Sequence, residues 1–227
     1  MDDKNEGLLL VNKAVGETSF NLVRKLRRRL NIKKIGHAGT LDPFATGLMV
    51  MLIGRKYTKL SDSFLNDDKE YIATAYLGIA TDSYDCDGQE ISKSEICPSL
   101  GEIEKLIEDS FQGEIMQTPP MFSAKKINGQ KLYKLARQGI EIERLPVAIK
   151  VDIKLLEYNY PSLKFQVLCS KGTYIRSIAH DMGEKLGCGA HLTALERIRC
   201  GKFPLSEAID SIDIENQSFD IQAKIRK

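Results

Sequence analysis

The stretch GHAGTLDPFATGLMVMLIG, residues 36–54, joins a glycine-rich segment to the longest clean apolar run of the chain. The run LMVMLI at 48–53 is too short for a confident helix, so we predict a core strand there. We interpret residues 36–47 as a loop in which Pro43 restricts the backbone of Asp42 to the extended region. Gly36 and Gly39 would let the backbone of a ligand approach closely. The stretch therefore predicts a core strand with a carboxylate presented just before it.

Two interpretations of Asp42 stay open at this point. Aspartate followed by proline is a common start of a helix, and taken alone the role of a helix cap is the stronger interpretation. His37 favours the other interpretation, because it adds an aromatic, hydrogen-bonding side chain to the same loop. A single carboxylate with no metal ligands and no obvious serine or cysteine nucleophile beside it indicates covalent or electrostatic work at a carbon atom.

Composition restricts the class of protein. The 227 residues suit one large domain, and a hydrophobic content of 42% suits a sizeable core. The five cysteines form no CxxC pair, and the spacing of Cys188 and His191 is answered by no second pair of ligands. The N-terminus MDDKNEG is too polar for a signal peptide, and the run at 48–53 is too short to span a bilayer. We expect a cytoplasmic protein without disulfides, bound metal or membrane association.

Charge is segregated along the chain. RKLRRRLNIKK at 24–34 carries seven basic residues and no acidic one, and residues 121–139 carry five basic residues and no acidic one. Residues 82–109 hold nine acidic side chains. One such basic cluster would be an ordinary solvated surface, but two without compensating acids favour binding to nucleic acid.

Periodicity predicts a mixture of helices and strands. We expect a helix over 19–31 with Thr18 or Ser19 as its N-cap, and an α+β fold whose mixed, mostly antiparallel sheet is flanked by helices. DSYDCDGQE at 82–90 predicts a turn and not a calcium loop, because Ser94 stands where the terminal acid would be needed. Further helices are expected over 55–65, 99–113 and 172–186, and further strands over 70–81, 147–158 and 163–172.

Several long motifs resemble one family. KIGHAGTLDPFATGLMVMLIGRKYTK (34–59) closely resembles the signature of the TruB family of pseudouridine synthases. The resemblance covers roughly residues 8–208, although Ala14 stands where the family usually has proline. It implies a pseudouridine synthase-like fold and the isomerisation of uridine 55 in the T loop of tRNA, without cofactor or metal. The other matching motifs are LLLVNKAVGETS (8–19), KEYIATAYLGIATDSYDCDG (69–88), PPMFSAKKINGQKLYKLARQGIE (119–141) and CSKGTYIRSIAHDMGEKLGCGAHLTALERIRCGKF (169–203).

The resemblance implies a catalytic role for Asp42, as nucleophile or as stabiliser of a sugar cation. Arg176 matches the arginine that keeps this aspartate ionised, although alone it could form an ordinary ion pair. Tyr174 matches an active-site tyrosine beside the aspartate. Residues 174 and 176 would point about 200° apart on a helix, so we predict that the helix begins at or after Arg176 if both serve the site.

Three further residues are implied to surround the target base. Tyr71 matches the tyrosine that stacks on the base and is a candidate for handling its C5 proton. His37 matches the residue that fills the space left when the base is flipped out. Leu195 matches an apolar contact on the other side of the uracil. Without the resemblance, Tyr71 and Leu195 would be core residues and His37 would cap its own glycine turn.

The resemblance also implies how RNA is held. The stretch 121–145 corresponds to a mobile insertion that clamps the tRNA arm. Basic side chains would contact phosphates, which positions the RNA without reading its sequence. The expected contacts are Lys13, Arg24, Arg27, Arg28, Lys33, Lys125, Lys126, Lys131 and Lys134.

The expected domain organisation is a catalytic domain over 1–210 and a short tail over 211–227. Bacterial members usually continue into a PUA-type RNA-binding domain, and DSIDIENQSFDIQAKIRK (210–227) is too short and polar to be one. We therefore expect activity in a monomer whose tRNA affinity is reduced and strongly salt-dependent. A non-catalytic RNA-binding module of the same fold, or a related synthase that acts on another uridine or RNA, remains the alternative.

Overall fold

The computed structural model describes residues 6–127 and 129–227. They belong to two compact units, and each is described by itself. Unit 1 combines the described part of Met1–Ile72 with Leu195–Lys227, and unit 2 is Ala73–Ala194. The boundary falls within strands β4 (Lys69–Leu77) and β12 (Ala190–Cys200).

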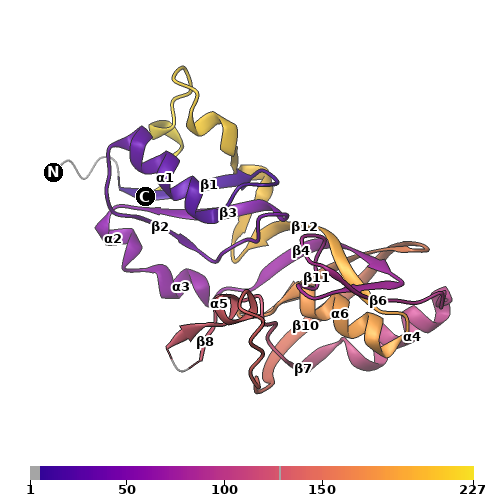
Figure 1. Ribbon diagram of the computed structural model, residues 1–227. Coiled ribbons are helices and arrows are strands. Elements are labelled where there is room, and N and C mark those ends of the chain that lie inside the picture. Colours follow the sequence, from indigo (N-terminus) through magenta and orange to yellow (C-terminus); the bar gives the residue numbers. More distant parts are fainter. Residues whose placement is uncertain (1–5, 128) are drawn as a thin grey trace. The chain divides into compact units, whose positions relative to one another are not determined.

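Unit 1 is built on strands in the order β14-β1-β3-β12, with β2 added to β3 and β13 to β12. Figure 1 labels β1, β2 and β3 of this unit. β1 and β3 pair antiparallel along their length, whereas β12 pairs with β3 in parallel. The remaining elements of unit 1 are β1 (Gly7–Lys13), α1 (Ser19–Leu30), β2 (Ile35–Ala38), β3 (Thr46–Ile53), α2 (Arg55–Thr58), α3 (Ser61–Leu65), β13 (Phe203–Pro204), η2 (Leu205–Glu207), β14 (Ile209–Asp210), η3 (Ser211–Ile214) and η4 (Gln222–Lys224).

Two predictions from periodicity are confirmed in unit 1. The apolar face of α1 is buried, and Thr18 caps the helix by accepting a hydrogen bond from the amide of Asn21. β3 is buried from Gly47 to Ile53, and its neighbours in the sheet are β1, β2 and β12. An apolar run with no polar alternation is typical of a strand that is covered on both faces.

The structure corrects two boundaries in unit 1. Gly36 and His37 lie in strand β2, not in a loop, and β2 pairs with β3. The loop that remains between these strands is residues 39–45, which we call the aspartate loop. The expected helix over 55–65 is two short helices, α2 and α3, because the chain turns at Lys59 and Leu60.

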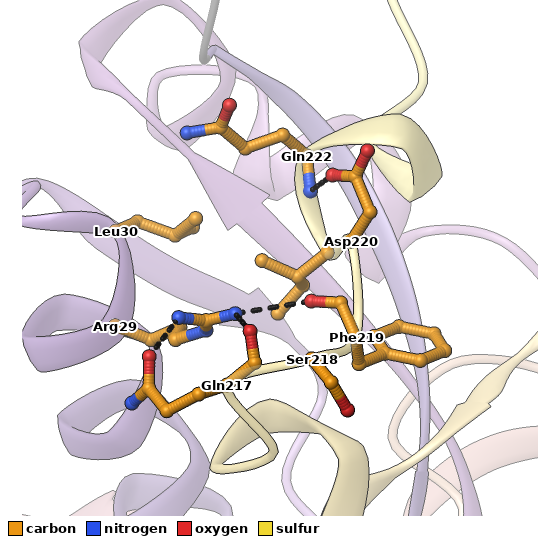
Figure 2. Close-up of a pocket in the computed structure, with 8 residues that line it drawn as sticks. Arg29, Leu30, Gln217, Ser218, Phe219, Asp220 and Gln222 are labelled. Carbon is orange, nitrogen blue, oxygen red and sulfur yellow. Dashed lines mark hydrogen bonds between the residues drawn. The ribbon is translucent and has the colours of Figure 1, made fainter.

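The C-terminal tail (211–227) folds against α1. Arg29 at the end of α1 donates hydrogen bonds to the carbonyl groups of Asn216, Gln217 and Phe219, as Figure 2 shows in part. A hollow of about 300 Å³ lies beside this guanidinium. Near the end of the chain, Leu8 and Arg226 exchange two backbone hydrogen bonds. The tail is therefore an integral part of unit 1.

Unit 2 contains a sheet of order β4-β11-β10-β7. β10 pairs antiparallel with both β11 and β7, and its inward side chains Ile149, Val151 and Ile153 are buried as the alternating pattern predicts. The remaining elements are β5 (Ile79–Thr81), β6 (Glu90–Lys93), α4 (Leu100–Ser110), β7 (Gly113–Gln117), β8 (Lys126–Ile127), β9 (Gln130–Lys131), α5 (Leu132–Ala136), β10 (Val147–Asn159), β11 (Ser162–Cys169) and α6 (Ile175–Lys185).

Local signals explain the boundaries in unit 2. α4 begins with a capping box, in which Ser99 and Glu102 satisfy each other's backbone amides. The expected strand over 70–81 is interrupted at Gly78, whose φ of +93° needs glycine, so it forms β4 and β5. The fold is α+β with a mixed, mostly antiparallel sheet, as predicted. No helix in the described ranges is long and apolar enough to cross a membrane.

Candidate active site

Asp42 lies in the aspartate loop of unit 1 and is half-buried. Residues 43–45 form a turn that leads directly into β3, and the carbonyl of Asp42 accepts a hydrogen bond from the amide of Ala45 at 3.1 Å. No helix follows Pro43, so the interpretation of Asp42 as a helix cap is wrong.

Lys13 was expected to contact RNA, and the structure corrects this prediction. Its side chain is 0% exposed, and its ammonium group donates hydrogen bonds to three backbone carbonyls within unit 1. They belong to Ala14, Glu17 and Pro43, at 3.0, 2.9 and 3.2 Å. A lysine enclosed in this way cannot reach a phosphate. It instead links the end of β1 to the residue that follows Asp42.

Electrostatics connects Lys13 with the aspartate loop. Burial lowers the pKa of Lys13 to about 8, while the negative charges of Glu17 and Asp42 oppose this shift. The buried guanidinium of Arg197 acts in the same direction as burial. The Asp42 carboxylate is thus one of the charges that act on the buried ammonium of Lys13.

His37 is held in its neutral form at neutral pH. Burial, and next the positive charge of Arg197, lower the pKa of the imidazole, while a backbone hydrogen bond with Gly39 opposes the shift. A neutral imidazole is easier to place against a base than an imidazolium, because it carries no charge to desolvate. The sequence did not single out Arg197, which is 1% exposed. The polar residues around Arg197 in the sequence do not indicate that its side chain is buried.

Two further candidate residues lie on strands of unit 1. Tyr71 is on β4 and 8% exposed, and Leu195 is on β12 and 7% exposed. Both are largely buried, as core residues are. Their contact with a base remains a prediction of the family resemblance.

Arg176 in unit 2 is 4% exposed and anchors a polar cluster. Its Nη1 donates a hydrogen bond to the carbonyl of Ser83 at 2.7 Å, and its Nη2 donates to that of Phe122 at 2.8 Å. Nη1 also lies 3.4 Å from Oδ2 of Asp85, which is itself buried. Arg176 is therefore not a surface ion pair. Its pairing with Asp42 stays a prediction.

Asp85 is a residue that the sequence analysis missed, because it was assigned only to a turn. Its Oδ1 accepts hydrogen bonds from the hydroxyl of Ser83 at 2.5 Å and from the amide of Asp87 at 3.1 Å. Ser83, Asp85 and Asp87 therefore form a fixed turn that presents one carboxylate oxygen to Arg176. The sequence feature that could have indicated a role for Asp85 is the number of aspartates in DSYDCDG, which is larger than a turn requires.

Tyr174 precedes α6 and has an extended backbone, with φ −104° and ψ 108°. The side-chain amide of Gln117 accepts a hydrogen bond from the Tyr174 amide at 2.8 Å and donates one to its carbonyl at 3.0 Å. The prediction that α6 begins at or after Arg176 is wrong by one residue, because the helix begins at Ile175. Tyr174 is nevertheless outside the helix, held there by the buried Gln117.

The remaining basic candidates lie in different surroundings. Arg24, Arg27, Lys33, Lys126 and Lys134 are exposed, and Lys125 and Lys131 are partly exposed. Arg28 is exposed but forms an ion pair with Glu215 in the tail. In the stretch 121–145, Leu132 is fully buried and anchors a short hairpin and α5. Within the described ranges, no group of three or more His, Cys, Asp or Glu side chains could hold a metal ion.

Comparison with known proteins identifies the family. Residues 27–175 match the family model described as the TruB family pseudouridylate synthase N-terminal domain. The chain belongs to the TruB family. Residues 176–225 match the model of the tRNA pseudouridylate synthase B C-terminal domain. Membership in the TruB family makes the chain a pseudouridine synthase, an enzyme of the isomerase class.

Relatives of this TruB-family chain that carry a name are tRNA pseudouridine synthases. The chain is 64% identical to tRNA pseudouridine synthase B of Protochlamydia amoebophila over 209 aligned residues. The alignment covers 92% of this chain and 79% of the relative. The chain is 56% identical over 221 residues to tRNA pseudouridine synthase B of Chlamydia muridarum, covering 97% and 91%.

Solved structures support the fold of the TruB-family chain. A Cbf5-Nop10-Gar1 complex contains a chain with a TM-score of 0.74 and 28% identity, matched over 97% of this chain. An H/ACA RNP bound to a substrate RNA containing 2'-deoxyuridine contains another, with a TM-score of 0.70 and 26% identity, also over 97% of this chain. The chain spans 59% and 58% of the lengths of those two proteins.

Proposed function

We propose that this chain isomerises uridine 55 in the T loop of tRNA to pseudouridine, with Asp42 as the catalytic residue. The observation that carries the proposal is the placement of Asp42 in a turn between strands β2 and β3, where the buried ammonium of Lys13 holds the carbonyl of the following residue, Pro43. The relatives of similar length are named tRNA pseudouridine synthase B. We further propose that the enzyme acts in the cytoplasm as a monomer.

Asp42 would act at the sugar carbon of the nucleotide, as a nucleophile or by stabilising positive charge on the sugar. Both roles need an ionised carboxylate, because a protonated acid neither attacks nor neutralises a cation. Within unit 1, the buried ammonium of Lys13 donates a hydrogen bond to the carbonyl of Pro43, the residue that follows Asp42. We propose that Arg176 and Tyr174 bind the substrate as the family resemblance implies.

The target base has to leave its stack before the sugar can be reached, at a cost of a few kcal/mol. We propose that Tyr71 stacks on the flipped base and that Leu195 contacts it from the other side. His37 would take the space that the base vacates, for which the neutral imidazole is suited.

Phosphates of the tRNA would be held by the exposed basic residues of α1 and of the stretch 121–145. Arg24, Arg27, Lys33, Lys126 and Lys134 are accessible for this role. The buried Lys13 is not among these phosphate contacts. We propose that the stretch 121–145 moves to clamp the tRNA arm.

Release of tritium from tRNA labelled at C5 of uridine tests the chemistry, because the C5 hydrogen is lost only when the base is rejoined through that carbon. We expect release by the wild-type chain and a loss of at least about a thousandfold for Asp42→Asn, with tRNA affinity retained. Asp109→Asn is a matched control, since this exposed carboxylate lies on α4. Full turnover by Asp42→Asn would reject the assigned chemistry.

The same assay separates the alternatives. A non-catalytic RNA-binding module would bind tRNA and release no tritium. A synthase for another uridine would release tritium from transcripts in which uridine 55 is replaced by cytidine. Mapping the modified position in an unmodified transcript identifies the target directly.

A further inference from the structure

Arg197 is a buried cation that contacts the first residue of the aspartate loop and the strand β3 that follows the loop. From β12, its Nε donates a hydrogen bond to the carbonyl of Leu48 at 2.7 Å, and its Nη2 donates to that of Gly39 at 3.3 Å. Nη2 also lies 3.1 Å from the sulfur of Met49. In the part of the chain that the structure describes, its polar contacts are these carbonyls and the sulfur, with no carboxylate. Burying a charge in this way is costly, which suggests that it serves the loop.

The backbone of Gly39 is shaped for this contact. Its φ is +89°, a conformation that favours glycine, and a Cβ built there would lie 3.3 Å from Nη1 of Arg197. The guanidinium therefore lies directly against the start of the aspartate loop. A larger residue at position 39 would push it away.

Ser19 holds the middle of the aspartate loop from the first residue of α1. Its hydroxyl is 3.1 Å from the carbonyl of Leu41, to which it donates, and it accepts a hydrogen bond from the amide of Leu41 at 3.0 Å. The serine is 4% exposed, so water does not compete for these two bonds. Leu41 directly precedes Asp42, and both of its backbone polar groups are thus held by one side chain.

We propose that Arg197 and Ser19 are positioning residues that hold the backbone of the aspartate loop so that Asp42 keeps one direction toward the substrate. This inference rests on the proposed function. Lys13 holds the next residue, Pro43, from the other side of Asp42. A displacement of about 1 Å in a reacting group can lower a rate by about a hundredfold, so the backbone around a catalytic carboxylate has to be rigid.

Single-turnover tritium release at saturating enzyme tests the positioning role. We expect Ser19→Ala and Arg197→Met to lower this rate by at least about tenfold, with tRNA affinity within about twofold of wild type. Ser19→Thr keeps the hydroxyl and should retain most of the wild-type rate. Arg197→Lys keeps the charge, but a single ammonium nitrogen cannot replace both Nε and Nη2, so its rate should stay low. Ser211→Ala is the control, because this buried serine contacts the backbone of Ala14 outside the aspartate loop. Unchanged single-turnover rates in folded Ser19→Ala would overturn the proposal.

Hydrogen exchange provides a second test that does not depend on activity. We expect the amide of Leu41 to exchange at least about tenfold faster in Ser19→Ala, while amides in the middle of β3 keep their wild-type rates. Equal exchange of Leu41 in both proteins would also overturn the proposal. If the wild-type chain releases no tritium from any tRNA, the proposed function fails, and the exchange result still decides whether Ser19 holds the loop. If Arg197→Met does not fold, the single-turnover rate and the hydrogen exchange of Ser19→Ala together test the proposal.

Discussion

The guanidinium of Arg176 and the carboxylate of Asp85 form a buried ion pair in unit 2, with Nη1 3.4 Å from Oδ2. The carboxylate is itself fixed by the hydroxyl of Ser83 and the amide of Asp87. A buried charge keeps a defined position only when such partners replace its hydration. The pair therefore fixes the beginning of α6, where Tyr174 and Arg176 are located.

We expect Asp85→Asn to destabilise the protein by about 3 kcal/mol, because the substitution removes one charged partner of a buried ion pair. The lower end of the usual range is expected, since Arg176 keeps the carbonyl groups of Ser83 and Phe122. Denaturation by guanidinium chloride measures the effect. Asp109→Asn breaks only an exposed pair with Lys105 and should change stability by less than about 1 kcal/mol. Equal stability of the two variants would contradict this account.

Lys13 should make stability depend on pH in the alkaline range. Its pKa falls from 10.5 in the unfolded chain to about 8 in the folded one, so between these values the unfolded chain binds more protons. The free energy of unfolding should therefore rise with pH over this interval, by at most about 3 kcal/mol, and this contribution is lost as pH falls through 8. The measurement is the difference between wild type and Lys13→Met at each pH. A difference that does not change from pH 7 to 10.5 would show that the lysine titrates normally.

Gly47 should tolerate no side chain. Its φ is +100°, and an added Cβ would lie 2.4 Å from the carbonyl oxygen of Arg197 and 2.6 Å from its amide nitrogen. Strain and overpacking together predict that Gly47→Ala destabilises the protein by about 2–5 kcal/mol. Gly101 on α4 has open space around it, and Gly101→Ala should be neutral or stabilising by up to about 1 kcal/mol. Thermal unfolding of both variants checks the contrast, and a stable Gly47→Ala would mean that β12 can move away from β3.

Phosphate contacts should appear in the salt dependence of tRNA binding. We expect Lys126→Gln and Lys131→Gln each to weaken binding and to reduce the slope of log K against log salt concentration by about 1. Lys154→Gln is the matched control, because this lysine is exposed on β10, outside the two basic segments. Binding titrations between about 50 and 200 mM salt give the slopes. Identical slopes for all three variants would remove the stretch 121–145 from the RNA-binding surface.

Local sequence patterns were sufficient to predict the helices and strands that bury one apolar face. The apolar spacing of Leu22, Leu26 and Leu30 predicted α1, and the alternation of Ile149 and Ile153 predicted β10. Neither prediction needs knowledge of the rest of the chain, because one buried face produces the pattern. The motif resemblance located Asp42 and Arg176, although their roles are still to be measured.

Local patterns failed where an element depends on a distant neighbour. β2 has four residues, among them Gly36 and His37, and is a strand only because β3 offers its edge. β12 carries Glu196, Arg197 and Arg199, which suggests a surface segment, yet pairing with β3 makes it central in unit 1. Propensity is weak for such short or polar strands.

By itself, the sequence determined the α+β class, elements such as α1, β3 and β10, the family, and the position of one carboxylate directly before a core strand. Only the tertiary structure decided that Lys13 and Arg197 are buried around the aspartate loop and that Asp85 pairs with Arg176. The physical reason is that a charged side chain leaves water only when polar groups replace it. Some of these groups come from far along the chain, as with Pro43 for Lys13 and Gly39 for Arg197. A local sequence pattern cannot predict contacts between residues so far apart in the chain.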